Sequence, residues 1–147
     1  MYKISFFCEG KPQGKERPRT VRKNGKVWSY TPKKTKEYEE KVKLAFLDNP
    51  DFFGCPFVTK EYQGKVSAYI NAYFEMPKSW PESRKFLNDG KNFLKKPDVD
   101  NIGKSILDSL NGIAYQDDSQ VSEVHVSKKY GRTAGVEVEI LYYNEKT

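Results

Sequence analysis

The sequence predicts a single α+β domain in which helices pack on one face of a small mixed β-sheet. Segments that begin at Tyr2, Lys65, Val121 and Gly135 alternate β-prone apolar residues with polar ones, as half-buried strands do. Segments with helical periodicity or helix-capping residues lie between them. The length of 147 residues fits one domain over the whole chain, residues 1–147, and the expected order of elements is β-α-β-α-α-β-β.

The first half of the chain predicts a strand, a long loop and a helix. Tyr2–Glu9 is the opening strand. Gly10–Lys26 is rich in Gly, Pro, Lys and Arg, which predicts a loop, and Val27–Tyr30 is a short extended piece. Lys34–Leu47 repeats apolar residues at spacings of three and four, which predicts a helix with Thr35 as its N-cap. Because long structureless loops are uncommon in small domains, we expect Gly10–Lys26 to be functional.

The second half predicts an irregular connection, two helices and three strands. Asn49–Gly64 holds two Pro and two Gly and is expected to be irregular. Ser79 and Glu82 have the spacing of a capping box, which starts a helix that stops near Gly90. The other expected elements are a strand at Lys65–Glu75, a helix at Asn101–Leu110, and strands at Val121–Tyr130 and Gly135–Tyr143 joined by a hairpin turn at Gly131–Ala134.

The composition excludes several classes of protein. Hydrophobic residues make up 37% of the chain and aromatic residues 14%, which is enough for a packed core and excludes wholesale disorder. No apolar run approaches the roughly 20 residues that a membrane span needs, and the N-terminal stretch predicts a strand instead of a signal peptide. Cys8 and Cys55 form no CxxC pair, so we expect a reduced, cytoplasmic chain in which both are buried.

The positive charge of the chain is concentrated near its N-terminus. The formal net charge is +6, and ten basic residues but only one acid, Glu16, lie between Lys11 and Lys36. Such a block suits a polyanion, most simply the phosphates of a nucleic acid. The alternative is a solvated loop that only keeps the protein soluble.

Acidic residues gather in a second segment, between Lys96 and Gln120. Asp100 and Asp108 fall with Lys104 along one face of the expected helix. A hairpin-like return after this helix would bring Asp118 against Asp98 and Asp100. Hard Mg²⁺ prefers carboxylate oxygens and recruits phosphate, so such a cluster in a basic protein indicates a metal-dependent phosphodiesterase site. Lys104 would stabilise the phosphate or orient the attacking water.

Each acid also has a structural interpretation. Asp100 can cap the helix, Asp117 and Asp118 can be turn residues, and Asp108 is treated as a solvated helix residue outside the metal set. Two other acidic motifs fail, because an EF-hand lacks its ligands and no acid-x-Lys of a PD-(D/E)xK nuclease follows Asp98. His125, the one histidine, lies in a predicted strand and is interpreted as a strand residue.

The motif KPDVDNIGKSILDSLNG, followed by DDSQV, resembles the RusA family of Holliday-junction resolvases, small endodeoxyribonucleases of phages and prophages. The N-terminal GKPQGKERPR and Tyr30-Thr31-Pro32 are similar to the opening of that family. The resemblance implies a homodimeric enzyme with a mixed α/β fold that depends on Mg²⁺, or on Mn²⁺ as a substitute. It would resolve four-way DNA junctions by paired symmetric cuts during recombination and repair. A two-fold dimer suits a four-way junction, and exposed Tyr and Phe of the strands are candidates for its interface as much as for the core.

The resemblance also implies roles for individual residues. Asp98, Asp100 and Asp118 match the catalytic metal-binding acids, Lys104 matches the catalytic lysine, and Asp117 is expected as a further metal ligand. The residues expected to contact DNA are Lys15, Arg17, Arg19, Arg22 and Lys128. Two alternative functions stay open: a non-catalytic basic DNA-binding module, and a broader structure-selective nuclease that also cuts flaps and forks.

Overall fold

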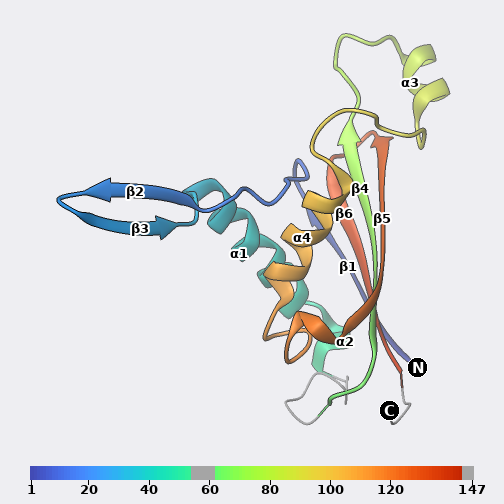
Figure 1. Cartoon of the computed structure of the whole chain (residues 1–147). Coiled ribbons are helices and arrows are strands. Elements are labelled where there is room, and N and C mark those ends of the chain that lie inside the picture. Colours follow the sequence, from blue (N-terminus) through green and yellow to red (C-terminus); the bar gives the residue numbers. More distant parts are fainter. Residues whose placement is uncertain (54–61, 144–147) are drawn as a thin grey trace.

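A four-stranded mixed sheet forms the body of the protein in the computed structural model, which describes residues 1–53 and 62–143 (Figure 1). The strands are β1 (Tyr2–Glu9), β4 (Val66–Glu75), β5 (Val121–Gly131) and β6 (Gly135–Tyr142). Their order across the sheet is β1-β6-β4-β5; β4 and β5 run parallel, and the other neighbours are antiparallel. The α+β class and the mixed sheet are therefore confirmed, and so is the expected order of elements around this sheet.

The predicted hairpin between the last two strands is wrong, because β4 lies between β5 and β6. The inner side chains of β4 are fully buried, and both of its edges are paired. An unpaired edge on this most apolar strand would be costly, because its backbone hydrogen-bonding groups would be exposed. In the fold, β5 and β6 cover one edge of β4 each. The Gly131–Ala134 segment instead crosses the end of β4, where the Met76 amide donates a hydrogen bond to the Gly131 carbonyl (3.2 Å).

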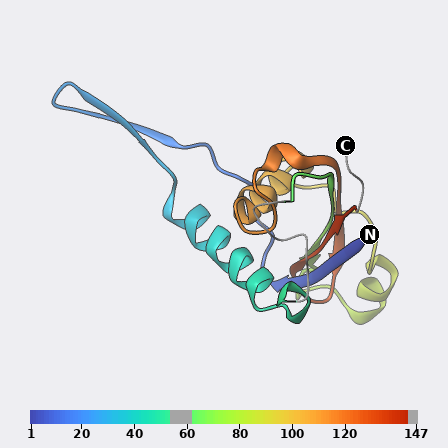
Figure 2. The ribbon, with the colours of Figure 1, turned by 90° about the horizontal axis from the view of Figure 1, so that it is seen from below.

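Two helices cover the inner face of the sheet, α1 (Lys33–Leu47) and α4 (Val99–Leu110) (Figures 1 and 2). Phe46 of α1 and the apolar face of α4, with Ile102, Ile106 and Leu110, are fully buried there. The short helix α2 (Pro50–Phe53) follows α1. Helices on one face were expected, and α1 and α4 confirm this. Cys8 is buried in the same core, whereas Cys55 lies outside the described residues.

The third helix, α3 (Glu82–Asn88), lies beyond the end of the strands and buries none of its residues (Figure 1). Its N-cap is Pro81, so the predicted Ser79 cap is wrong. The predicted Thr35 cap is wrong too, because α1 begins after Pro32 and Thr35 is buried inside it. Proline suits both helix starts, since its fixed φ is already helical and it has no amide hydrogen to satisfy.

A second, two-stranded sheet forms within the segment that the sequence predicts as a loop. Strands β2 (Arg19–Lys23) and β3 (Lys26–Tyr30) pair antiparallel and project away from the body (Figures 1 and 2). Asn24 (φ 52°) and Gly25 (φ 73°) join them in left-handed conformations, as a two-residue hairpin turn requires. The loop prediction is therefore wrong for its second half. We call residues 19–30 the arm.

In the part of the chain that the structure describes, no helix is long and apolar enough to cross a membrane. His125 stacks on Tyr69 of the neighbouring strand, with ring centroids 4.6 Å apart, which confirms the prediction that it is a strand residue. The irregular connection expected at Asn49–Gly64 begins with α2, and residues 54–61 lie outside the described residues.

Candidate active site

Three of the predicted site residues line one pocket between α4 and β5. Asp100 and Lys104 come from successive turns of α4, and Asp118 comes from a one-turn 3-10 helix that precedes β5 (Asp118–Gln120). The pocket has a volume of about 560 Å³ and also includes Val99, Gly103, Leu107, Asp108, Val124 and Val126. The expected helical face and the return of Asp118 toward Asp100 are thus present, and we call this the site pocket.

Gly103 allows α4 to lie close against β5. A Cβ atom at this position would lie 3.1 Å from Cγ2 of Val126, which is tighter than ordinary van der Waals contact. The glycine stands directly before Lys104, so the close approach brings the turn that carries the lysine up to the strand. The apolar side chains of Val124 and Val126 form the wall of the pocket opposite the charged helix face.

The loop that carries Asp118 is held by two buried tyrosines. The hydroxyl of Tyr115 donates to the Leu107 carbonyl of α4 (2.6 Å), and that of Tyr142 donates to the Ala114 carbonyl (2.6 Å). Burial raises the pKa of Tyr115 above its usual value, and the nearby carboxylates, Asp118 first, raise it further. Tyr115 therefore stays a neutral donor, and the two hydrogen bonds fix the position of the loop against α4 and β6.

Gln120 fixes the turn itself. Its side-chain oxygen accepts hydrogen bonds from the amides of Gln116 (2.8 Å) and Asp117 (3.2 Å). Its side-chain nitrogen donates to the carbonyls of Tyr62 (3.1 Å) and Gly64 (3.2 Å), just before β4. Sequence reasoning missed Gln120 and the two tyrosines. The three-residue spacing of Asp117 and Gln120 is that of a capping box and could have indicated the turn. The two tyrosines carry no such signal, because each bonds to the backbone eight or more residues away.

Asp117 has a different role from its neighbour. It is the N-cap of the 3-10 helix, where its carboxylate accepts a hydrogen bond from the Ser119 amide (3.2 Å) and Gln120 completes a capping box. The bonds from Ser119 hold the pKa of Asp117 below its usual value. Asp117 does not line the site pocket. This geometry supports the interpretation of Asp117 as a turn residue.

Asp98 does not line the site pocket with Asp100 and Asp118. It is the N-cap residue of α4 and lines a neighbouring pocket, which is formed with the N-terminal segment from Lys11 to Glu16. The helix starts at Val99, so the two-residue spacing does not place Asp98 and Asp100 on the same side. Within residues 1–53 and 62–143, no three His, Cys, Asp or Glu side chains lie close enough together to hold one metal ion.

The donor set of the site pocket nevertheless fits Mg²⁺. Asp100 and Asp118 are exposed, and no ion pair between described residues involves either of them. Magnesium in phosphate chemistry keeps several waters and takes one or two protein carboxylates plus substrate phosphate, not a closed protein cage. Two free carboxylates beside a lysine meet that requirement. Asp108 is already paired with Lys15, which agrees with leaving it out of the metal set.

Lys15 does not have the exposed position expected of a DNA contact. Its ammonium pairs with Glu39 of α1 and with Oδ2 of Asp108 (3.3 Å), and its side chain is only 17% exposed. Desolvation lowers the pKa of Lys15, but the hydrogen bonds with these two carboxylates outweigh it and raise the pKa above its usual value. The backbone of Lys15 also donates to the Asn101 carbonyl (2.9 Å), so this lysine ties the N-terminal segment to both helices.

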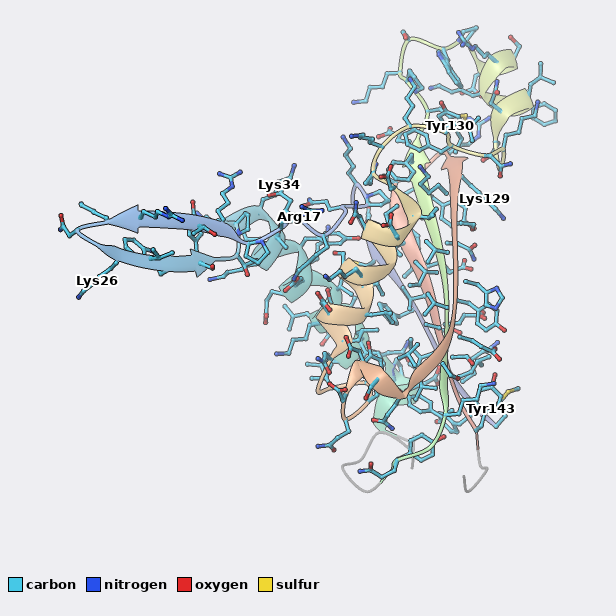
Figure 3. The ribbon with its side chains drawn as sticks, viewed as in Figure 1. Arg17, Lys26, Lys34, Lys129, Tyr130 and Tyr143 are labelled. Carbon is cyan, nitrogen blue, oxygen red and sulfur yellow. The ribbon has the colours of Figure 1, made fainter. Side chains whose placement is uncertain are left out.

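Lys128, the basic position expected on β5, holds the loop that leads into the acidic motif. Its ammonium donates to the carbonyls of Lys95 (2.6 Å) and Pro97 (3.0 Å). The other expected DNA contacts are more accessible: Arg17, Arg19 and Arg22 are all exposed. Figure 3 shows Arg17 where the chain enters the arm and Lys26 near its tip. The arginines are thus accessible to phosphate, whereas the Lys128 ammonium already bonds to the loop before the acidic motif.

Comparison with known proteins identifies one family. The family described as Endodeoxyribonuclease RusA matches residues 9–141 of the chain. The chain is also 38% identical over 142 residues to the uncharacterized protein YqaN of Bacillus subtilis (strain 168), a match that covers 93% of this chain and 94% of the relative. Both matches run through the N-terminal basic segment, the acidic motif and the strand that follows it.

Proposed function

The chain belongs to the RusA family of endodeoxyribonucleases, and from this premise we propose that it resolves Holliday junctions by divalent-metal-dependent hydrolysis. The observation that supports this most is the shared pocket of Asp100, Lys104 and Asp118. Free carboxylates beside a cation suit a phosphodiester only if a metal ion offsets their repulsion of the phosphate. The proposed role is the resolution of four-way junctions in DNA recombination and repair.

We assign the protein groups as follows. Asp100 and Asp118 would hold Mg²⁺, with Mn²⁺ as a substitute, and the ion would activate a water and stabilise the leaving oxygen. Lys104 would bind a non-bridging oxygen of the scissile phosphate, where charge grows during the reaction. Asp98 stays a proposed ligand, since it belongs to the acidic segment within the residues that match the family, and Asp117 is better explained as the cap of the turn.

Two cuts are needed to resolve a junction, and we propose that a homodimer makes them. The two sites of a C2 dimer are related by the same symmetry as the opposed strands of a four-way junction. Paired nicks at symmetric positions would then follow from one binding event. A dimer also doubles the number of exposed arginines that face the phosphates.

The test of this assignment is removal of the Asp100 charge. Asp100→Asn should abolish junction cleavage but leave junction affinity equal or tighter, because one less negative charge faces the phosphates. Lys104→Ala should lower the cleavage rate more than the affinity. Asp89→Asn, which removes an exposed acid at the end of α3, is the matched control and should cut like the wild type. Wild-type cleavage by Asp100→Asn would contradict the assignment.

A non-catalytic DNA-binding module is the second candidate, and the exposed basic arm favours it. It predicts salt-sensitive binding of DNA but no cleavage that depends on a metal ion. A broader nuclease that cuts flaps and forks as well as junctions is the third. It predicts the same dependence on Asp100 but comparable rates on all branched substrates.

A further inference from the structure

The arm presents two aromatic rings and several cations on one of its faces. Residues directly opposite in an antiparallel pair share a face, and faces alternate along each strand. The register pairs Arg19 with Tyr30 and Val21 with Trp28. One face therefore carries Arg19, Tyr30, Val21, Trp28, Lys23 and Lys26, and the other carries Thr20, Ser29, Arg22 and Val27.

This aromatic face is uncovered. Trp28 is 45% exposed and Tyr30 42%, and every residue of the two strands except Val21 is exposed. Figures 1 and 2 both show the arm pointing away from the sheet and the helices. An isolated two-stranded hairpin is marginally stable in water, and exposed large aromatic side chains beside one another usually mark a binding surface. The arm is therefore a contact for a partner.

The charge of the arm indicates which partner covers it. From Arg17 to Tyr30 the chain has five basic residues and no acid. A second copy of a chain with a net charge of +6 is a poor match for this surface, whereas nucleic acid phosphate is a good one. Aromatic rings between cations match nucleic acid further, because bases that are not fully stacked bind to aromatic faces while their phosphates bind to the cations.

From these observations we infer that the arm recognises the branch of the DNA substrate, with Trp28 and Tyr30 stacking on bases exposed at the crossover while Arg19, Lys23 and Lys26 hold the adjoining phosphates. This inference rests on the proposed function only in taking DNA as the partner. In linear duplex the bases are already stacked on one another, so the rings gain little there. At an open crossover, the last base pair of each DNA duplex that meets there has one face without a stacking neighbour. The arm thus favours branched over linear DNA.

Fluorescence of Trp28 tests the stacking directly. The chain has two tryptophans, and Trp80 packs against Tyr130 and Arg84 near α3. In Trp80→Phe, Trp28 is the single reporter. Titration with a four-way junction in EDTA, where no metal-dependent cleavage occurs, should quench its emission strongly, and a linear duplex of matched sequence should quench it little. Equal quenching by both, or no quenching by the junction, would overturn the inference.

Affinity provides an independent readout with a control from the same strand. Trp28→Ala should weaken junction binding roughly tenfold or more and leave duplex binding unchanged. Val27→Ala changes the next residue, which is 61% exposed on the opposite face, and should leave both affinities unchanged. Trp28→Phe should keep the preference for the junction, which shows that a ring is needed and that the arm still folds. Equal losses in Trp28→Ala and Val27→Ala would overturn the inference.

The salt dependence separates stacking from charge. Lys26→Ala, which removes a cation from the aromatic face, should flatten the dependence of affinity on salt, for junction and duplex alike, whereas Trp28→Ala should leave it unchanged. Failure of the inference differs from failure of the proposed function. In the first case Trp28→Ala still cuts junctions selectively, and in the second Trp28 is quenched but no junction is cut.

A shift of Trp28 emission with protein concentration in the absence of DNA would show that a second copy covers the arm and would overturn the inference.

Discussion

Asp117 and Asp118 are neighbours with the same charge, yet they lie in different environments. The Asp118 carboxylate lines the site pocket, and the Asp117 carboxylate caps the 3-10 helix. The pair therefore offers a comparison in which the net charge removed is the same. Any difference in cleavage between variants of the two residues reports on position and not on the overall field of the protein.

Asp118→Asn should reduce the cleavage of junctions by several orders of magnitude, because it removes one of the proposed metal-holding carboxylates. Asp117→Asn should cut at nearly the wild-type rate, since asparagine is as good an N-cap as aspartate. Single-turnover rates with saturating Mg²⁺ measure both. Loss of cleavage in Asp117→Asn with intact folding would restore Asp117 to the metal set.

Residue types and spacing predicted part of this site. Asp100, Lys104 and Asp118 follow from helical periodicity and a turn, because the contacts that align them are local or cross one return of the chain. Asp98 lies at the N-cap of α4 and outside the site pocket, because the helix starts one residue after it and ends the extended spacing that the prediction assumed. The roles of Tyr115 and Gln120 depend on carbonyls of other elements, and no local pattern predicts such bonds.

At the scale of elements, the contact between β5 and the 95–97 loop fixes the position of the acidic motif that follows the loop. Lys128 of β5 donates to two carbonyls of this loop, and the chain enters α4 directly after it. In the alternative role, the same ammonium would bind a DNA phosphate instead of the two carbonyls. The two roles differ in what a variant does to the salt dependence of binding.

Lys128→Met keeps the length of the side chain but removes the two hydrogen bonds. It should lower the cleavage rate roughly tenfold through a looser loop, since small displacements of catalytic groups are costly. The salt dependence of junction binding should stay unchanged. If Lys128 contacts phosphate, the slope of log affinity against log salt falls by about one instead. Filter binding over a series of salt concentrations distinguishes the two roles.

Two elements show why the fold was only partly predictable. The Asn24-Gly25 dipeptide between β-prone residues is a hairpin signal, but the surrounding Lys and Arg suggested a loop. The hairpin expected between β5 and β6 had good turn residues at Gly131–Ala134, and the tertiary pairing with β4 decided otherwise. Strand order depends on which edges remain unpaired in three dimensions, so alternation along the chain predicts strands but not their neighbours.

At the scale of the whole molecule, a basic arm and an acidic pocket are carried by different parts of the fold. The arm projects from the start of α1, and the pocket lies between α4 and β5 (Figure 1). The arm and the site pocket together suit a substrate long enough to contact both. With two copies of each, a dimer would match the symmetry of a four-way junction.

Dimerisation is therefore expected in solution. Sedimentation equilibrium at low micromolar concentration should give twice the 17.1 kDa of the chain. The dimer should persist in EDTA, because the proposed metal-holding carboxylates come from one chain and not from two. A monomer in the presence of junction DNA would contradict the paired-cut mechanism, although single nicks by each copy would keep the catalytic assignment.

The central claim is metal-dependent cleavage that is selective for a four-way junction. The most direct measurement incubates the purified protein with a synthetic junction and with linear duplex of the same sequence, in Mg²⁺ and in EDTA. Paired nicks in the junction only, lost in EDTA and regained with added Mg²⁺, are the predicted result. Tight binding of the junction without any cut in Mg²⁺ or Mn²⁺ would contradict the claim.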